Sequence, residues 1–138
     1  MTKITFQLPI YTFQIDFIGH VNNAIYVQWM EIGRTKLLDG IGMSIDKIAQ
    51  NGIVPVLVST EIKYIQPLHL GDQVRVEMWL SELRRASAWI EFRFYNQNEK
   101  LVASAKQLGL FVDTATNRPH RLSKEDRELF EQFVHQEE

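Results

Sequence analysis

One helix-patterned segment near the N-terminus constrains the fold more than any other part of this sequence. From about Asn22 to Asp39 the residues follow a helical period, and apolar side chains occupy two adjacent lines of that helix. Ala24, Val27 and Leu38 widen this apolar surface beyond an ordinary stripe. A helix that is apolar over most of its circumference is usually surrounded by other elements. We therefore expect a fold in which the rest of the chain wraps around this helix.

Most of the remaining sequence has the pattern of antiparallel β-strands. Apolar and polar residues alternate, or β-prone residues dominate, in runs separated by turns. These runs cover residues 4–8 (continued by β-prone residues 11–15), 53–65, 74–80, 88–94 and 101–112. A phase change near Gln107 predicts a bulge or a change of packed face, and short helices are expected at 45–50 and after Ser123. Four or five strands with one early buried helix predict an α+β fold.

Length and charge restrict the classes of protein to which the chain can belong. The 138 residues fit one domain spanning 1–138. Fifteen Lys and Arg against seventeen Asp and Glu give a net charge of −2, which argues against binding to nucleic acid or to anionic membranes. No segment approaches the roughly 20 apolar residues of a membrane span, and the N-terminus lacks the continuous apolar run of a signal peptide. We therefore expect a cytoplasmic protein.

The cysteine and histidine content argues against thiol and metal chemistry. The absence of cysteine excludes disulfides, thiolate zinc sites, iron–sulfur clusters and cysteine nucleophiles. The four histidines are far apart in the sequence and lack the spacing of metal ligands: His20, His69, His120 and His135. The sequence therefore predicts chemistry by oxygen, nitrogen or backbone groups, without a metal.

The densest chemistry lies between Asp16 and Asn23, where a strand pattern ends and the helix pattern begins. The first N–H groups of a helix have no partners within it, and they carry the positive end of the helix dipole. Such groups can polarise a carbonyl or hold an oxyanion, while a nearby carboxylate acts as base or nucleophile. Asp16 is in position to supply that carboxylate. Alternatively it only caps the turn, since Asp is a favoured turn residue.

The same corner is part of two longer patterns. The first is Asp16-x-x-Gly19-His20-Val21-Asn22-Asn23-x-x-Tyr26, followed along the helix by Glu31-x-x-Arg34. The second is Tyr64-x-x-Pro67-Leu68-x-x-Gly71-Asp72. Together they resemble the hotdog-fold thioesterases of the 4-hydroxybenzoyl-CoA thioesterase family, and the His-Val-Asn-Asn variant resembles acyl-CoA and acyl-carrier-protein thioesterases. The resemblance extends from about Phe6 to Val112.

This resemblance implies a hotdog fold, in which a curved antiparallel sheet wraps around one long central helix. It implies that Asp16 is the catalytic carboxylate, as general base or nucleophile, and that the backbone N–H of Asn23 polarises the thioester carbonyl. The side chains of His20 and Asn22 are then expected beside the acyl group or an attacking water. No metal or organic cofactor is implied. Members of the family are dimers or tetramers of dimers, in which two subunits share each site.

Several residues of the pattern have a second interpretation. His20 is either a substrate-side residue or a turn residue with satisfied ring nitrogens. Tyr26 is a substrate-binding candidate, but its helical position also predicts a core residue whose hydroxyl reaches a neighbour. Glu31 and Arg34 are three apart on the helix, which predicts an ion pair. Since one branch of these thioesterases carries its carboxylate on the helix, Glu31 is the reserve catalytic candidate.

Two basic groups are candidates for binding the phosphates of CoA, because the family often binds them with basic residues on the outer rim. The first comprises Arg84, Arg85 and Ser87 at a predicted hairpin end, and the alternative is that these are solvated turn residues. The second group, with the same two interpretations, comprises Arg118, His120 and Arg121.

Oligomerisation is expected on physical grounds as well. A single sheet around one helix leaves a long β edge and an apolar rim exposed. Trp79 and Trp89 fall on the opposite phase from the aliphatic positions of their strands, so they are candidates for a subunit interface. We expect a homodimer or a homotetramer.

The leading function is hydrolysis of an acyl-CoA or acyl-carrier-protein thioester. A hotdog dehydratase is the first alternative, but the catalytic His motif of those lyases has no counterpart in this sequence. A non-catalytic acyl-thioester-binding protein is the second, and the presence of Asp16 speaks against it. Phe17, Ile18 and Val21 indicate an apolar acyl pocket, which suits fatty-acyl and aryl groups equally.

Overall fold

The alternating runs form the strands of one antiparallel sheet in the computed structural model, which describes residues 2–135. The strands are β1 (Ile4–Leu8), β2 (Ile53–Tyr64), β3 (Val74–Leu83), β4 (Ser87–Tyr95) and β5 (Leu101–Asp113), with the two-residue β6 (Arg118–Pro119) beside β5. Their order across the sheet is β1-β3-β4-β5-β2, so β1 and β2 are its two edges. The predicted α+β architecture is therefore confirmed.

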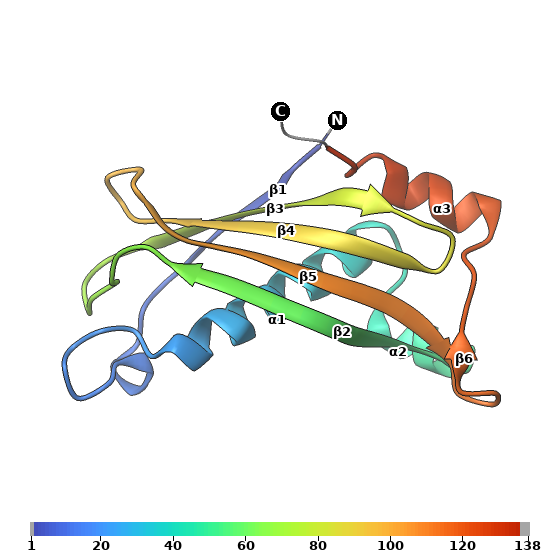
Figure 1. Ribbon diagram of the computed structural model, residues 1–138, viewed down its shortest axis with the longest axis horizontal. Coiled ribbons are helices and arrows are strands. Elements are labelled where there is room, and N and C mark those ends of the chain that lie inside the picture. Colours follow the sequence, from blue (N-terminus) through green and yellow to red (C-terminus); the bar gives the residue numbers. More distant parts are fainter. Residues whose placement is uncertain (1, 136–138) are drawn as a thin grey trace.

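The long helix α1 (Asn23–Gly40) lies in the hollow of this curved sheet (Figure 1). The helix and the sheet come close at Gly33, where an added Cβ atom would lie 2.7 Å from the Met78 sulfur and 3.2 Å from the Phe92 ring. A side chain at this position would push the helix away from the sheet. Glycine therefore allows the short distance between the two.

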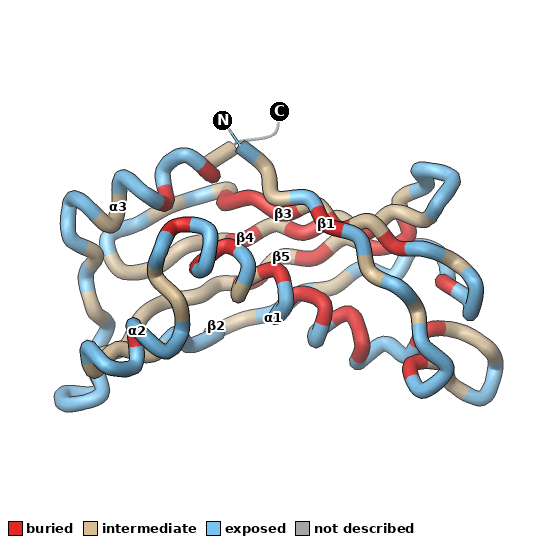
Figure 2. The backbone as a smooth tube through the Cα atoms, turned by 180° about the vertical axis from the view of Figure 1, so that it is seen from behind, coloured by how far each residue is buried: buried red, intermediate tan, exposed pale blue. Residues whose placement is uncertain are grey.

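Only one side of α1 is covered within a single chain. Trp29 and Met30 are almost fully buried, whereas Val27 and Ile32 are 41% and 39% exposed. Buried and exposed stretches accordingly alternate along α1 in Figure 2. The prediction that other elements surround this helix is thus met on the side of the sheet, and an apolar surface remains open on the other side.

Two shorter helices lie beyond α1 in the sequence. Helix α2 (Ile45–Gln50) has the bounds that the sequence predicts. Helix α3 (Lys124–Glu131) begins after Ser123, whose hydroxyl accepts a hydrogen bond from the Asp126 N–H at 3.1 Å. It buries Phe130 in the core that the sheet and α1 share.

The sequence predicts that residues 11–15 continue the first strand, but this prediction is wrong. These residues contain a short 3₁₀ turn (Thr12–Gln14) instead. The Gln14 side chain accepts a hydrogen bond from the Tyr11 N–H at 2.8 Å, and the Gln14 N–H donates to the Tyr11 carbonyl at 2.9 Å. These two bonds close the turn and take the chain out of the sheet before it reaches α1.

The phase change near Gln107 is not a bulge in β5. The Gln107 side chain continues the inward-facing phase of Ala105 and is fully buried. The pairing of β5 with β4 is regular through Gln107, and the nearby irregularity belongs to β2, where Val58 has no register partner. A buried amide in an otherwise apolar phase therefore explains the apparent slip.

Trp79 and Trp89 differ in how far the chain itself covers them. Trp79 is 3% exposed, because Lys3 lies 4.3 Å from its ring centroid and His135 contacts it edge-on. Trp89 is half-buried, and the Lys106 ammonium lies 4.9 Å from its ring centroid. The chain itself covers Trp79, so the expected use of this residue at a subunit interface is wrong.

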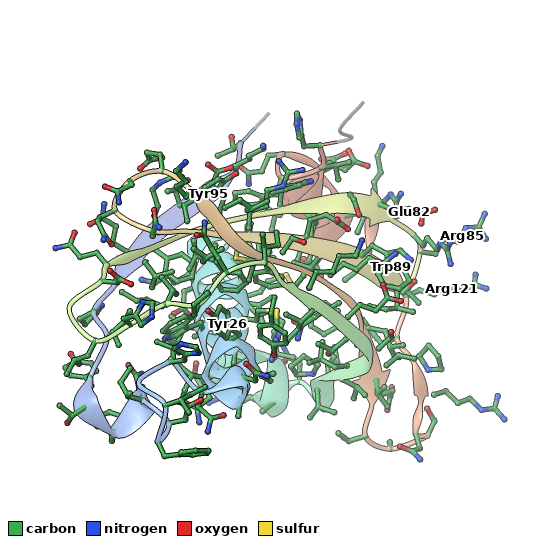
Figure 3. The ribbon with its side chains drawn as sticks, turned by 60° about the vertical axis from the view of Figure 1, so that its left-hand side comes forward. Tyr26, Glu82, Arg85, Trp89, Tyr95 and Arg121 are labelled. Carbon is green, nitrogen blue, oxygen red and sulfur yellow. The ribbon has the colours of Figure 1, made fainter. Side chains whose placement is uncertain are left out.

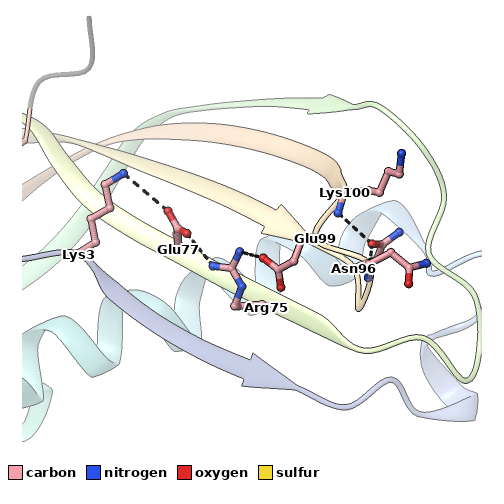
Figure 4. Close-up of polar contacts among 7 residues, drawn as sticks. Lys3, Arg75, Glu77, Asn96, Glu99 and Lys100 are labelled. Atoms are coloured by element: carbon pink, nitrogen blue, oxygen red, sulfur yellow. Dashed lines mark hydrogen bonds and ion pairs between the residues drawn. The ribbon is translucent and has the colours of Figure 1, made fainter.

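Charged side chains join β1 to β3 and to the β4–β5 hairpin (Figure 4). The Lys3 ammonium lies 3.7 Å from a Glu77 carboxylate oxygen, and Arg75 binds Glu77 at 2.6 Å and Glu99 at 2.5 Å. Arg75 also stacks on Tyr95, 4.4 Å from the ring centroid. Hydrogen bonds to Glu99 and then to Glu77 raise the pKa of Arg75, so this guanidinium stays charged within the network.

Candidate active site

The segment between β1 and α1 forms a closed loop whose two arms are hydrogen-bonded to each other. The Asp16 N–H donates to the His20 carbonyl at 2.8 Å, and the Asn22 N–H donates to the Gln14 carbonyl at 2.8 Å. Gly19 turns the chain with a φ of +86°, a conformation that favours glycine. The loop thereby holds Asp16 at the corner where α1 begins.

Asp16 is half-buried and uses one carboxylate oxygen for the turn. Its Oδ1 accepts hydrogen bonds from the N–H groups of Ile18 and His20, each at 3.1 Å. Its Oδ2 has no hydrogen-bond or ion-pair partner among residues 2–135. Asp16 therefore does cap the turn, as the plain interpretation predicts, and its second oxygen is not used by the fold.

The start of α1 offers a backbone donor at the same corner. Asn22 is the N-cap, and its side chain accepts a hydrogen bond from the Ala24 N–H at 3.0 Å. The Asn23 carbonyl accepts a hydrogen bond from the Tyr64 hydroxyl at 3.0 Å, but the Asn23 N–H has no acceptor in the described part of the chain. The Asn22 side-chain oxygen is thus committed to the helix cap, and the Asn23 N–H is the group able to polarise a carbonyl.

His20 contacts a histidine from the β2–β3 connection. The rings of His20 and His69 are nearly perpendicular with centroids 5.0 Å apart, and their backbones form an isolated bridge. The His69 N–H donates to the Asp72 carboxylate at 2.8 Å. Burial alone would raise the pKa of Asp72, but hydrogen bonds from His69 and Gln97 outweigh it and lower that pKa. Asp72 therefore stays ionised and holds His69 beside the corner.

Tyr26 is a core residue at this end of the helix. It is 3% exposed, and its ring contacts those of Trp29, Tyr64 and Phe94. Its hydroxyl has no hydrogen-bond partner within residues 2–135, so the predicted neighbour is not found. Burial and, second, the nearby Tyr64 raise the pKa of Tyr26 to about 12. Tyr26 is therefore protonated at neutral pH and cannot serve as a base.

A pocket of about 180 Å³ lies at the opposite end of the sheet, between the second half of α1 and α3. Its lining is mainly apolar and includes Leu38, Leu57, Leu83, Ile90, Phe111 and Phe130. Strand β2 links the two ends of the molecule, since it lines this pocket near its start and reaches the corner at Tyr64. Within one chain, the pocket and the corner are thus separated by most of the length of β2.

Glu31 and Arg34 give the lining of this pocket a charged side, and Gln107 binds Arg34 next to it. The Arg34 guanidinium donates to the Gln107 side-chain oxygen at 2.6 Å, and the Gln107 amide donates to the Thr60 hydroxyl at 3.2 Å. Arg34 forms no ion pair with Glu31 in the described residues, so the predicted pair is wrong. Burial lowers the pKa of Arg34, and the charge of Glu31 partly offsets that effect.

Two basic segments that are distant in the sequence meet at the rim of this pocket. The Leu122 N–H donates to the Arg85 carbonyl at 3.0 Å, which joins the β3–β4 turn to the segment before α3. Arg85 and Arg121 project outward at the same end of the molecule in Figure 3, far from Tyr26. Neither forms an ion pair among the described residues. Arg85 and Arg121 are therefore the cations of this rim that are available to a ligand.

Other members of the two basic groups have partners or a different place. Arg84 pairs with Glu82 at 3.1 Å. Ser87 is half-buried, lines the pocket and accepts a hydrogen bond from the Arg84 N–H through its carbonyl. Arg118 lies in β6, and the His120 N–H is bonded to the backbone of β5. The rim therefore combines residues from both sequence groups rather than Arg84 and Arg85 alone.

Over residues 2–135, no helix is long and apolar enough to cross a bilayer. In the same range, no three acidic or histidine side chains are grouped as ligands for a metal ion.

Comparison with known proteins identifies the family. The model of the thioesterase-like superfamily matches residues 12–132. The chain belongs to this superfamily. The acyl-acyl carrier protein thioesterase ATL3 of Arabidopsis thaliana is 28% identical over 133 residues, which cover 96% of this chain and 70% of that protein. The putative acyl-CoA thioesterase YneP of Bacillus subtilis is 28% identical over 111 residues, which cover 80% of each.

A solved structure agrees with the fold of this superfamily member. The DHNA-CoA thioesterase from Staphylococcus aureus superposes with a TM-score of 0.88 at 17% identity, over 96% of this chain and 91% of that one. The hotdog fold is therefore confirmed. The superfamily and its named relatives also confirm the predicted activity class, so the chain is a thioester hydrolase.

In this thioesterase the predicted site residues separate into two groups. Asp16, His20, Asn22 and Asn23 meet at the corner before α1, whereas Arg84, Arg85 and Ser87 lie at the pocket end. Sequence reasoning missed His69 and Gln107. His69 reaches the corner through a long-range bridge that no local pattern reveals. The phase change at Gln107 is visible in the sequence, but its hydrogen bond with Arg34 is not.

Proposed function

We propose that this thioesterase hydrolyses an acyl-CoA thioester at a site built by two copies of the chain. The Asp16 carboxylate acts as base on a water or as nucleophile on the carbonyl carbon, and the Asn23 N–H polarises the carbonyl oxygen. One observation carries the proposal: the hydrogen-bonded corner before α1 contains both a carboxylate oxygen of Asp16 and the Asn23 N–H, neither of which has a partner among residues 2–135. Relatives named for acyl-CoA and acyl-carrier-protein substrates support this substrate class.

The open edge at β2 supports a homodimer. Val56, Leu57 and Val58 of this edge strand are 39%, 37% and 58% exposed, and Val27 and Ile32 add exposed apolar surface on α1. An unpaired strand with apolar neighbours is a surface through which chains associate. Two identical strands related by a two-fold axis across the sheet pair antiparallel, and pairing of such dimers yields the tetramer.

Antiparallel pairing of two β2 strands explains why the site needs both copies. If the axis passes near the middle of β2 (Ile53–Tyr64), residues 60–64 of one strand lie beside residues 53–57 of the other. The first range adjoins the Asp16 corner, and the second lines the pocket. The corner of one subunit then combines with the pocket and basic rim of its partner.

The rim of the pocket binds the phosphates of CoA. Arg85 and Arg121 project outward at this end (Figure 3), and guanidinium groups suit phosphate geometry. Arg84 contributes less, because Glu82 already pairs with it.

Asp16→Asn tests the catalytic part of the proposal. Asparagine keeps an oxygen that accepts the Ile18 and His20 hydrogen bonds, so the turn is retained while the charge is lost. Turnover of acyl-CoA should fall by at least about 10²-fold, while the melting temperature and the binding of a non-hydrolysable analogue change little. Asp113→Asn is the matched control, because the Asp113 side chain also accepts backbone hydrogen bonds in a turn, from Ala115 and Thr116, outside this corner. Wild-type turnover in Asp16→Asn contradicts the mechanism, and Glu31 then becomes the next candidate.

The double change Arg85→Ala/Arg121→Ala tests the nucleotide rim. KM for acyl-CoA should rise about tenfold with kcat nearly unchanged, as for an interaction equal in ground and transition states. Hydrolysis of a short thioester without the nucleotide should be unaffected, and Lys100→Ala, at the opposite end of the sheet, should behave as wild type. Equal losses on both substrates would mean that the rim stabilises the fold instead. Faster turnover of acyl-carrier-protein thioesters than of acyl-CoA would reassign the substrate carrier.

A further inference from the structure

The turn that carries Asp16 exposes two apolar side chains that the chain itself does not cover. Phe17 is 100% exposed and Ile18 is 59% exposed. The turn is nevertheless held firmly, because the Asp16 side chain accepts hydrogen bonds from Ile18 and His20, and its carbonyl accepts one from Gly19 at 3.0 Å. Apolar side chains presented on a hydrogen-bonded turn indicate a surface that another group covers.

The pocket at the other end of the sheet has the complementary apolar chemistry. Its volume of about 180 Å³ and its apolar lining leave room for an apolar group at its mouth. For scale, an apolar cavity of roughly 150 Å³ takes up benzene. Val56 and Ile45, which belong to its lining, are 39% and 44% exposed, so the pocket is open in a single chain.

The antiparallel pairing of β2 strands brings these two features together. The exposed turn adjoins the Tyr64 end of β2, and the pocket adjoins its Ile53 end. A two-fold axis near the middle of the strand places the Tyr64 end of β2 in one subunit beside the Ile53 end of β2 in the other. The exposed turn of each subunit then lies over the open pocket of the other, twice in each dimer.

We propose that Phe17 and Ile18 of one subunit close the pocket of the other and cover the acyl carbons next to the thioester carbonyl. This inference rests on the two-subunit site of the proposed function. Phe17 and Ile18 directly follow Asp16, so the acyl group must pass them as it leaves the attacked carbonyl for the pocket. A straight chain passes beneath the Phe17 ring, whereas a methyl branch beside the carbonyl collides with it. The two residues therefore select straight-chain acyl groups over branched ones.

Engineered disulfides test the geometry without reference to activity. The chain has no cysteine, so Phe17→Cys combined with Ile45→Cys, or with Val56→Cys, introduces the only thiols. Because a disulfide needs Cα atoms within roughly 7 Å, oxidation should give a covalent dimer on a non-reducing gel only if the turn of one subunit reaches the pocket of the other.

The matched control for the cross-link is Phe13→Cys combined with Ile45→Cys. Phe13 is a 79% exposed aromatic residue of the same segment that lies outside the Asp16 turn. This pair and each single-cysteine variant should stay uncross-linked. The inference is overturned by a protein that sediments as a dimer but whose Phe17→Cys variants form no cross-link to a cysteine at either pocket position.

Phe17→Ala tests the selectivity. The ratio of kcat/KM for a 2-methyl-branched acyl-CoA to that for its straight-chain isomer should rise at least about tenfold, since a methyl group in a fitted pocket is worth roughly 10- to 200-fold. Phe13→Ala should leave the ratio unchanged. An unchanged ratio in Phe17→Ala overturns the inference while the proposed function stands. By contrast, full activity in Asp16→Asn or an inactive wild type contradicts the proposed function itself.

Discussion

The two edge strands of the sheet, β1 and β2, differ in length and in the side chains around them. β1 is five residues long, and its neighbourhood is tied down by the Thr2–Gln132 backbone bond at 2.9 Å and the Lys3–Glu77 pair. β2 is twelve residues long, carries exposed valine and leucine, and pairs only with β5 in the described part of the chain. Short strands with charged neighbours resist association, whereas long apolar edges favour it. The fold thus closes one edge and leaves the other available for assembly.

The polar ties behind the two edges differ in the same sense. Near β1 they are charged and partly solvated, as in the Arg75 pairs with Glu77 and Glu99. Behind β2 the tie is internal, from Arg34 on the helix through Gln107. The charged network near β1 lies on the surface and keeps that edge hydrated. The hydrogen bonds of Gln107 lie inside the molecule, so the outer surface of β2 stays apolar and can contact a second subunit.

Of the substitutions that test this difference between the edges, Val58→Lys should have the largest effect, which is on dimer formation. Val58 is 58% exposed on the open edge and has no register partner, so a single chain tolerates the change. In the dimer the two-fold axis places two lysines close together, and such like-charge contacts cost several kcal/mol. The dimer dissociation constant should rise at least about 100-fold by sedimentation, and turnover should fall with it at nanomolar protein.

Thr5→Lys is the matched control on the closed edge. Thr5 is an exposed residue of β1, so the same charge is placed on the other edge strand. Association and turnover should remain as in the wild type. If Thr5→Lys dissociates the protein and Val58→Lys does not, the assignment of the two edges is reversed.

The fold was largely predictable because its signals are periodic and local. The apolar helix, the alternating strands and the Ser123 cap each depend on neighbours in the sequence, and each matches an observed element. The errors occurred where a side-chain hydrogen bond overrides the periodic pattern. Gln14 diverts residues 11–15 into a turn through its own side chain, and Gln107 places an amide among the apolar inward-facing residues of β5, where it accepts a hydrogen bond from Arg34.

The site was predictable only in part, because half of it is not contiguous. The corner from Asp16 to Asn23 is one short segment, so its grouping follows from the sequence. The rim at Arg85 and Arg121 joins two segments through the Leu122–Arg85 backbone bond, which no local pattern reveals. Trp79 shows the same limit of prediction from local patterns. Its phase in the strand indicates exposure, but the distant residues Lys3 and His135 cover it.

Gln107→Leu tests the internal tie behind β2 and should have an intermediate effect. Leucine leaves the half-buried Arg34 guanidinium without its acceptor, which costs about 1–3 kcal/mol of unfolding free energy. Adding Arg34→Met should restore most of the loss, because removing both polar partners is far less costly than removing one. Urea unfolding at one fixed protein concentration measures both, since dimer stability depends on concentration. Additive losses in the double variant would mean that the two residues do not act as a pair.

Arg75→Met tests the charged network at the closed edge and should have the smallest effect. Methionine keeps an apolar contact with Tyr95 but loses the ion pairs with Glu77 and Glu99, whose combined contribution at a partly solvated site is about 1 kcal/mol or less. The loss should shrink in 1 M salt, where the Debye length is only about 3 Å. Lys100→Met, in the same hairpin region, removes a charge that has no ion pair among residues 2–135 and should leave the urea midpoint unchanged. If Arg75→Met also weakens the dimer, the charged network contributes to association as well as to the stability of β1. The two edges would then differ only in how strongly each contributes to association.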